Sequence, residues 1–372
     1  MPDAAHTGAT PVGSDTLVQV KDLEVRFDTV LGTVRALNGV SFSIGRGRVV
    51  GIVGESGSGK TMTGLAIMQL IPKPGQVTAG EILLKADRDK PSRDLLRLDR
   101  DSPEMRHIRG DQVGMIFQEP MTSLNPVYTV GNQIEEAILL HQTGNRDEAL
   151  RGAVDILRRV GMPNPERVVT QYPHELSGGM RQRAMIAMAL SCNPDLLVAD
   201  EPTTALDVTT ESQILQLMRD LQADFGMSIM FITHNMGVVA QMCDEVAVMY
   251  LGRIVEKATV DDIFYNPKHP YTVALLRSIP RIGRRGGKLE VIEGSVPDPY
   301  TTVPGCPFHP RCPARIAGVC DRLVPLETTV DGDGHTVRCH LYPGSTVGAE
   351  PGTSGLALNE DGTEVPATGE LS

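Results

Sequence analysis

Short apolar runs alternate with longer amphipathic stretches over most of the chain. Residues 17–27 ("LVQVKDLEVRF") alternate apolar and polar positions, as a half-buried strand does. Residues 48–54 and 195–200 are short apolar runs bounded by turn residues, which is typical of strands buried in a parallel sheet. Helical spacing of apolar residues occurs in residues 61–71, 127–144 and 213–226. This order predicts an α/β core with crossover helices, to which the amino-terminal part adds an antiparallel β layer.

The ends of the chain differ in composition from its middle. Residues 1–15 and 345–372 are rich in small and polar residues without periodicity, which predicts disordered tails. Between the tails we expect one large domain, residues 16–270, and a small cysteine-bearing appendage, residues 271–344. Residues 85–110 are predicted to be a polar surface insertion in the large domain.

Charge and hydropathy exclude several classes of protein. The 372-residue chain has a formal charge of −11 and no long cluster of Lys and Arg, which argues against broad binding to nucleic acid or anionic lipid. Its apolar runs are too short to span a bilayer. The amino-terminal stretch "MPDAAHTGATPVGSD" has no basic start and no apolar centre, so it does not read as a secretory signal. We therefore expect a cytosolic protein with reduced thiols.

The first candidate site is the segment "GESGSGKT", Gly54 to Thr61, which lies between an apolar strand and a helix. This spacing and setting match a phosphate-binding loop, in which glycines let backbone N–H groups face the phosphates. The dipole of the following helix favours the same anion. Lys60 is predicted to reach the β- and γ-phosphates, and the Thr61 hydroxyl to bind Mg²⁺. A glycine-rich turn with an incidental lysine is the alternative.

A buried strand that ends in two carboxylates forms the second candidate site, "LLVADEP". Asp200, at the carboxyl end of the strand, is predicted to hold Mg²⁺ through water, and Glu201 to activate the attacking water as a general base. Two surface carboxylates in a turn between strand and helix are the alternative. The phosphate loop earlier in the chain favours the catalytic interpretation.

The third candidate site is the turn that opens a helix in "LSGGMRQR". Exposed N–H groups at such a helix start bind anions. A nucleotide already held by the phosphate loop has little use for a second phosphate contact from the same chain. Two chains placed head to tail would use both sites, because Ser177, Gly178 and Gly179 of each would cover the other's γ-phosphate. Ser177 as a plain helix N-cap is the alternative.

Together these segments resemble the ABC-type ATPases over about residues 16–270. The resemblance implies a RecA-like phosphate-loop core with an antiparallel β subdomain and a helical subdomain. It implies that Phe27 stacks on adenine and that Gln118, in "MIFQEP", contacts Mg²⁺ and the catalytic water. It also implies that Asp207, in "TALD", lies in a loop that crosses a dimer interface, and that His234, in "FITH", contacts the γ-phosphate. A core Phe, a strand-end Gln and a satisfied polar His are the structural alternatives.

The resemblance also defines the nucleotide contacts and one departure. The implied contacts of the phosphate loop are Gly54, Ser56, Gly57, Ser58, Gly59, Lys60, Thr61 and Met62. Met180 stands where the family signature usually has Gln, whereas the Ser-Gly-Gly turn is retained. Because Lys60, Glu201 and His234 are all present, the site is predicted to be competent in hydrolysis.

Two further segments indicate to which branch of the family the chain is similar. Residues 117–136 and 261–280 resemble the ATP-binding subunits of bacterial oligopeptide and dipeptide importers, a branch that also serves nickel and related small solutes. The resemblance implies ATP and Mg²⁺ as ligands and, as partners, a second ATPase subunit, two transmembrane permeases and an extracytoplasmic solute-binding protein. The second ATPase is expected to be a paralogue. The chain is then expected at the cytoplasmic face of the membrane, held by the permeases near Gln118 and residues 120–180.

A soluble ABC-type ATPase without a link to transport is the alternative function. A chromosome or DNA-repair ATPase of this type would need a long coiled coil between the phosphate loop and the signature turn. The insertion here is too short and has no sustained heptads.

Four of the six cysteines gather near the carboxyl end, with five, seven and eighteen residues between them. They are Cys306, Cys312, Cys320 and Cys339. Four thiolates can hold a [4Fe–4S] cluster or Zn²⁺. The sequence has no closely spaced zinc knuckles, and the resemblance to peptide-importer ATPases also points to an iron–sulfur cluster. Zinc and free thiols are the alternatives, and a cytosolic setting disfavours disulfides.

The remaining cysteines and two nearby histidines receive other assignments. Cys192 and Cys243 are expected to be small buried apolar residues. His309 and His340 flank the quartet and could replace a thiolate, but the quartet itself is the predicted ligand set. The bound metal is expected to stabilise an appendage too small to build its own core.

Overall fold

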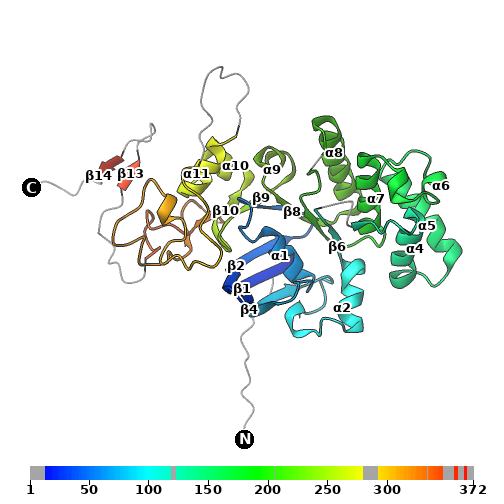
Figure 1. The fold of residues 1–372 in the computed structure, drawn as a ribbon, viewed down its shortest axis with the longest axis horizontal. Helices are drawn as coiled ribbons and strands as arrows, with labels where there is room; N and C mark the ends of the chain where they lie inside the picture. Colours follow the sequence, from blue (N-terminus) through cyan, green and yellow to red (C-terminus); the bar gives the residue numbers. More distant parts are fainter. Residues whose placement is uncertain are drawn as a thin grey trace, which may run out of the picture.

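The computed structural model describes residues 13–118, 123–204, 206–279, 292–332 and 334–346, together with two short strands near the carboxyl end. Two larger sheets organise these residues, with helices around the second (Figure 1). The predicted α/β core with an added antiparallel layer is confirmed. Most of the predicted amino-terminal tail lies outside the described residues.

The antiparallel layer is a four-stranded sheet in the order β2-β1-β4-β5. Its strands are β1 (Thr16–Thr29), β2 (Gly32–Gly45), β4 (Gly75–Leu84) and β5 (Arg93–Asp94). In β1 the buried positions Val18, Val20, Leu23 and Val25 face the core, and the register shifts by one residue between Val20 and Leu23. The apolar–polar alternation of residues 17–27 is therefore that of a half-buried strand, as predicted.

The main sheet has the order β11-β12-β10-β9-β3-β8-β7-β6. Its mutually parallel strands are β3 (Val49–Val53), β6 (Val113–Ile116), β7 (Leu196–Asp200), β8 (Ser228–Thr233) and β9 (Glu245–Tyr250). All residues of β3, β6, β7 and β8 are buried, which explains their continuous apolar sequences. The strand β10 (Arg253–Thr259) pairs antiparallel with β9.

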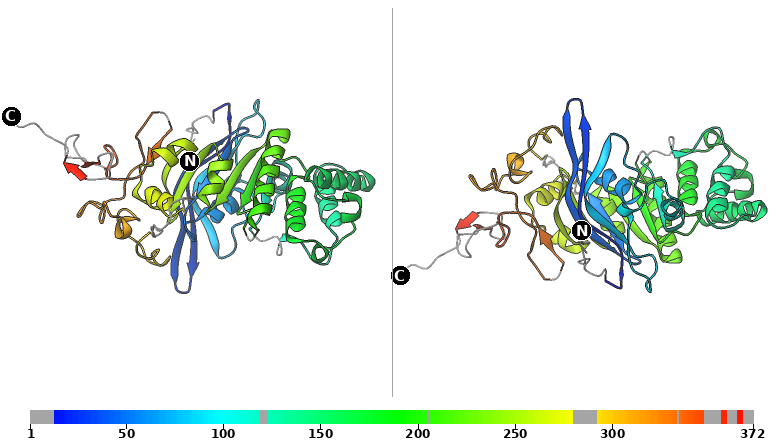
Figure 2. Two further views of the ribbon diagram at one scale, coloured as in Figure 1. Left: turned by 90° about the horizontal axis from the view of Figure 1, so that it is seen from above. Right: turned by 90° about the horizontal axis from the view of Figure 1, so that it is seen from below.

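The helices connect the strands and form a separate group at one end of the sheet (Figures 1 and 2). The connecting helices are α1 (Lys60–Ile67), α2 (Pro103–His107), α8 (Val208–Phe225), α9 (Met236–Met242), α10 (Val260–Tyr265) and α11 (Pro270–Arg277). The group at the end comprises α4 (Val130–His141), α5 (Arg146–Arg159), α6 (Pro165–Val168) and α7 (Gly178–Leu190). This group is the helical subdomain, and the cysteine-bearing extension lies at the opposite end of the molecule.

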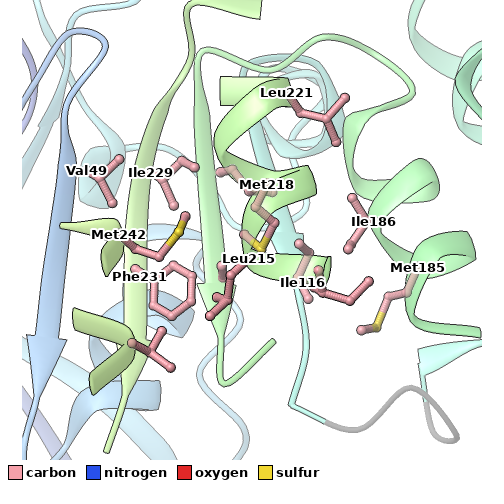
Figure 3. Packing of buried hydrophobic residues seen from close by; sticks show 14 of the residues in the cluster. Val49, Ile116, Met185, Ile186, Leu215, Met218, Leu221, Ile229, Phe231 and Met242 are labelled. Carbon is pink, nitrogen blue, oxygen red and sulfur yellow. The ribbon is translucent and has the colours of Figure 1, made fainter. Parts of the chain in front are cut away.

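Aliphatic and sulfur-containing side chains make up most of the core, which contains no tryptophan and only a few aromatic residues. Figure 3 shows Phe231 of β8 between Met242 of α9 and Leu215 and Met218 of α8. Methionine adapts to irregular gaps because its side chain is unbranched and flexible.

The insertion at residues 85–110 is only partly a surface feature, which corrects the prediction. It contains β5, a 3₁₀ turn (Leu95–Arg97) and α2. Leu95, Met105 and Ile108 are fully buried against the core of the antiparallel layer. These three residues are too widely spaced among charged ones to stand out as a periodic pattern in the sequence.

The carboxyl-terminal extension is joined to the main sheet rather than set apart from it. Its strand β12 (Thr336–Val337) pairs with Glu256 and Lys257 of β10, and β11 (Thr328–Thr329) pairs with β12. The predicted division near residue 270 stays a proposal. In residues 345–372, where we predicted a disordered tail, β13 (Leu356–Leu358) pairs with β14 (Glu364–Pro366).

The buried carboxylate of Glu256 holds the extension to the core of the protein. Its side chain is fully buried and accepts hydrogen bonds from the backbone N–H groups of Lys268 (2.7 Å) and His269 (2.8 Å). Nε2 of His335, in the extension, lies 2.9 Å from the same carboxylate. One buried carboxylate thus links β10, the start of α11 and the turn before β12.

Among the described residues, no helix is both long and apolar enough to cross a bilayer.

We expect Glu256→Ala to lower the free energy of unfolding by about 3–5 kcal/mol, because it leaves buried hydrogen-bond donors of two segments without an acceptor. Denaturant unfolding followed by circular dichroism measures the change. Glu327→Ala is the matched control, since Glu327 forms an exposed pair with Arg338 whose loss costs at most about 1 kcal/mol. Equal losses in the two variants would contradict the assigned role of Glu256.

Candidate nucleotide-binding site

The carboxyl ends of four parallel strands meet at one edge of the main sheet. The phosphate loop follows β3, Gln118 follows β6, Glu201 follows β7 and His234 follows β8. Ligands of open α/β sheets bind at such an edge. The fold therefore brings together four groups that are far apart in the sequence.

The phosphate loop packs closely against the strands behind it. Gly59 has φ of 102°, and a Cβ there would lie 2.6 Å from the carbonyl oxygen of Ala36. Any side chain at this position would therefore clash with backbone, which accounts for the glycine. The helix α1 begins at Lys60, so its first N–H groups open onto the loop.

Lys60 folds back over the loop that precedes it. Its Nζ donates hydrogen bonds to the carbonyl oxygens of Gly54 (2.9 Å) and Glu55 (3.1 Å). Burial lowers the pKa of Lys60, and the carboxylates of Glu201, Asp200 and Glu55 partly oppose this shift. The ammonium group is thus surrounded by oxygen atoms at the position where a phosphate would enter.

A cavity of about 620 Å³ opens over the loop, a volume suited to a nucleotide. Predicted site residues that line it are Ser56, Gly57, Ser58, Gly59, Lys60, Thr61, Met62, Gln118, Glu201 and His234. Gly54 and Asp200 lie directly behind this lining, since each is hydrogen-bonded to a lining residue.

Thr61 and Asp200 form the candidate Mg²⁺ site. The Thr61 hydroxyl donates to Oδ1 of Asp200 at 3.2 Å. Burial raises the pKa of Asp200, the Thr61 hydrogen bond lowers it and nearby Glu201 raises it further, with a net increase. Adjacent hydroxyl and carboxylate oxygens are the donors that Mg²⁺ prefers, so these residues fit the ion.

Glu201 is held by three side chains. Its carboxylate lies 2.9 Å from Nδ1 of His234 and accepts hydrogen bonds from Nε2 of Gln118 (3.1 Å) and the hydroxyl of Thr204 (2.8 Å). Burial alone would raise the pKa of Glu201, but the hydrogen bonds from His234 and Thr204 and the charges of His234 and Lys60 outweigh it and lower the pKa. The residue also has a positive φ of 45°, a costly conformation for a side chain of this size. The structure thus holds the Glu201 carboxylate in a fixed position at the cavity, where a general base would stand.

The predicted second anion site lies elsewhere on the surface. Ser177 is the N-cap of α7 and accepts a hydrogen bond from the Met180 N–H (3.4 Å). Asp207 caps the neighbouring α8, where it accepts from Thr209 and Thr210. A Cβ on Gly179 would lie 3.2 Å from Cγ2 of Thr210, so the two helix starts are adjacent. Ser177, Gly178, Gly179 and Asp207 are outside the lining of the cavity, and their contact with a nucleotide stays a prediction.

The half-buried ring of Phe27 does not line the cavity. Phe27 pairs with Gly75 across the antiparallel sheet, and a Cβ on Gly75 would lie 2.5 Å from Cε1 of the ring. The ring thus packs as the core residue that was the alternative interpretation. Adenine stacking on Phe27 is not supported by this geometry and stays a prediction.

One wall of the cavity was not predicted from the sequence. The extension contributes Asp298, Pro299, Thr301, Thr302, Val303, Pro304, Gly305, Pro307 and Val324 to the lining. Arg253, at the start of β10, also lines the cavity. These residues follow no phosphate-binding pattern, and only the folded chain brings them to the site.

The four clustered cysteines form no disulfide in the structure. Burial, with a smaller contribution from the neighbouring thiols of the quartet, raises the pKa of Cys306 to about 11 and that of Cys339 to about 12. In the part of the chain that the structure describes, no group of three or more His, Cys, Asp or Glu side chains is arranged to hold a metal ion. The predicted [4Fe–4S] cluster or Zn²⁺ is therefore not confirmed. Cys192 and Cys243 are buried, as predicted.

Two family models match the chain. Residues 37–204 match the family described as ABC transporter. Residues 255–320 match the family described as oligopeptide/dipeptide transporter, C-terminal region. The second match includes three of the four clustered cysteines.

Curated relatives are similar over most of their length. The dipeptide transport ATP-binding protein DppD of Bacillus subtilis is 49% identical over 328 residues, which cover 88% of this chain and 95% of DppD. The oligopeptide transport ATP-binding protein AppD of the same organism is 49% identical, with 88% and 97% covered. A putative peptide import ATP-binding protein of Brucella melitensis is 50% identical, with 87% and 96% covered.

Solved structures resemble the core. A dimeric, post-hydrolysis structure of the ATP-binding cassette MJ0796 with ADP and phosphate has a TM-score of 0.57 and 28% identity, and it covers 66% of this chain and 99% of that one. Together with the relatives above, this likeness shows that the chain belongs to the ATP-binding proteins of ABC transporters, in the oligopeptide/dipeptide transporter branch.

Proposed function

We propose that this chain is the ATP-hydrolysing subunit of a membrane importer for peptides. The single observation that supports ATP hydrolysis is the position of the Glu201 carboxylate, which His234, Gln118 and Thr204 hold at the cavity of the phosphate loop. The names of the relatives, which refer to dipeptide, oligopeptide and peptide transport, support the peptide cargo. Nickel or another small solute is the alternative cargo within the same branch.

The residues of the cavity divide the hydrolytic step among them. The loop N–H groups and Lys60 bind the β- and γ-phosphates of ATP and orient them. Thr61 and Asp200, with Gln118 nearby, would hold Mg²⁺, which would neutralise phosphate charge when bound. Glu201 takes a proton from the attacking water, whose oxygen bonds to the γ-phosphorus as the bond to the ADP oxygen breaks. His234 keeps Glu201 in position and lies within the same lining, where it can contact the γ-phosphate.

Two ATPase chains complete each other's sites in this proposal. Ser177, Gly178 and Gly179 are exposed or partly exposed at the start of α7, next to Asp207 at the start of α8. Placed against a second chain, this surface covers the γ-phosphate bound there. Bound ATP then favours the closed pair, and hydrolysis releases it. We propose a paralogue as the second chain.

The other partners follow from the importer function. Two permease subunits span the membrane and dock near Gln118 and the helical subdomain, and a solute-binding protein delivers the cargo on the far side. The chain itself is peripheral, on the cytoplasmic face. Isolation of the intact complex and identification of its subunits tests this set of partners. A preparation that contains no permease would favour the soluble ATPase instead.

We expect Glu201→Gln to bind ATP and to slow hydrolysis by about 10²–10⁴-fold, because the general base is lost while the hydrogen-bond partners are kept. With Mg²⁺ and ATP this variant should form a stable pair, measured by light scattering after gel filtration, alone or with the co-expressed second ATPase. Adding Ser177→Arg should abolish pairing but leave nucleotide binding intact. Lys60→Ala serves as the control that loses binding itself.

Normal turnover by Glu201→Gln would contradict the role of Glu201. A nucleotide-loaded Glu201→Gln chain that stays monomeric even beside its native second ATPase would contradict the shared site. Pairing with an identical chain alone would identify a homodimer.

We also propose that Cys306, Cys312, Cys320 and Cys339 hold a [4Fe–4S] cluster. The backbone N–H of Ile316 donates to Sγ of Cys320 at 3.3 Å. Backbone N–H groups also partly oppose the rise in the pKa of Cys306, Cys312 and Cys339. Such hydrogen bonds stabilise cluster sulfurs, and buried thiols are inert unless a metal removes their protons. The flanking histidines are engaged otherwise, His309 with the Cys306 carbonyl and His340 with Thr346 and the Leu323 carbonyl. The cluster would bind segments of the extension together.

We expect the chain purified without oxygen to contain iron and acid-labile sulfide in equal amounts, about four of each per chain. Cys320→Ser should lose most of both, whereas Cys192→Ser, outside the quartet, should keep them. One zinc per chain without iron would identify a zinc site instead. A chain with neither metal would leave the quartet as free thiols.

A further inference from the structure

Arg311, in the extension between Cys306 and Cys312, reaches the phosphate loop. Its Nη1 lies 2.7 Å from Oε2 of Glu55 and its Nη2 lies 3.1 Å from Oε1, so the guanidinium binds the carboxylate with two parallel hydrogen bonds. The Arg311 side chain is only 4% exposed. Two-pronged pairs of this kind are strong and fix both partners in orientation.

The surroundings hold the guanidinium in place. Arg311 also donates to the carbonyl oxygens of Glu293 (3.1 Å) and Ile292 (3.4 Å) and to the hydroxyl of Tyr250 (3.4 Å). Its guanidinium lies over the Tyr250 ring, 5.9 Å from the centroid. Phe308 packs against the same tyrosine, with ring centroids 5.2 Å apart. The arginine is thus part of a rigid, packed contact between the extension and the core.

Glu55 connects this contact with the phosphate-binding groups. Its backbone N–H donates to the hydroxyl of Tyr271 (2.8 Å), and its carbonyl accepts from Nζ of Lys60 (3.1 Å) and from the N–H of Ser58 (3.2 Å). The charge of Glu55 also acts on Lys60, whose pKa it raises against the effect of burial. The Glu55 carboxylate is therefore within electrostatic reach of the ammonium group that meets the phosphates.

A carboxylate in a loop that receives a triphosphate opposes binding unless a cation neutralises it. In the described chain the partner of this carboxylate is Arg311, which comes from the extension and not from the ATPase core. We propose that Arg311 is a positioning residue that neutralises Glu55, so that the carboxyl-terminal extension sets the affinity of the phosphate loop for nucleotide.

Variants that change the net charge of the Arg311–Glu55 pair test the proposal. Arg311→Gln leaves the Glu55 carboxylate unpaired and should raise the Kd of the full-length chain for MgATP about tenfold or more. The loss of affinity in Arg311→Gln should decrease from ATP to ADP to AMP, because each nucleotide in this order carries less negative charge for the Glu55 carboxylate to repel. Glu55→Gln removes the repelling charge and should bind ATP at least as tightly as the natural chain. The double variant, neutral at both positions, should return to within about threefold of natural affinity.

Competition against a fluorescent ATP analogue gives these affinities, and ATP hydrolysis by the intact importer supplies a second readout. For Arg311→Gln we expect a raised KM and a kcat within about threefold of the natural value, since the Glu201 contacts are untouched. Arg311→Lys should recover part of the affinity, because the ammonium keeps the positive charge but cannot form the two parallel hydrogen bonds of the guanidinium. Arg322→Gln is the matched control, an exposed arginine of the same extension.

The opposite pattern overturns the proposal. If Glu55→Gln and Arg311→Gln weaken ATP binding alike, or if the double variant binds as weakly as Arg311→Gln, the pair only supports the fold. Unchanged ATP affinity in Arg311→Gln also overturns it. If Arg311→Gln does not fold, Glu55→Gln and the double variant still decide, because the proposal requires both to bind ATP well.

Discussion

The register of the parallel strands is the constraint on which the site depends. Val53 pairs with Thr233, Asp200 with Ile232 and Ile116 with Ala199, so these strands end almost level with one another. Both faces of this sheet are buried, and a slip by one residue would turn every side chain to the opposite face. The hydrophobic core therefore fixes where Glu201, His234 and Lys60 stand, although none of these three belongs to it.

The parts of the site that could be predicted are those encoded in contiguous residues. The loop from Gly54 to Thr61 and the pair Asp200 and Glu201 each carry their chemistry and their structural setting within a short segment. A strand of known direction followed by such a segment leaves few ways to arrange it. Gln118 and His234 were accessible only through resemblance to a family, since a single polar residue after a strand has many structural explanations.

The parts that could not be predicted depend on contacts between distant segments. Arg311 and Glu55 are separated by 256 positions, and nothing in the sequence around either residue indicates that the two form an ion pair. The wall of the cavity from Asp298 to Pro307 belongs to an irregular segment whose path is set by its attachment to the core. Phe27 is a different case, because its ring packs against Gly75 outside the lining of the cavity and its contact with adenine stays a prediction. In the insertion, Leu95, Met105 and Ile108 are buried by contacts with distant segments, and their charged sequence neighbours give no periodic pattern that would predict this.

The pairing of β12 with β10 has a consequence for how the molecule meets other proteins. A strand at the margin of a sheet exposes unpaired N–H and C=O groups that another chain can join. Here a short piece of the extension occupies the margin of β10, and its own neighbour β11 has only two residues. Such a brief outer strand offers little length for unwanted pairing. The extension thereby covers part of an edge strand at which the sheet could otherwise pair with another chain.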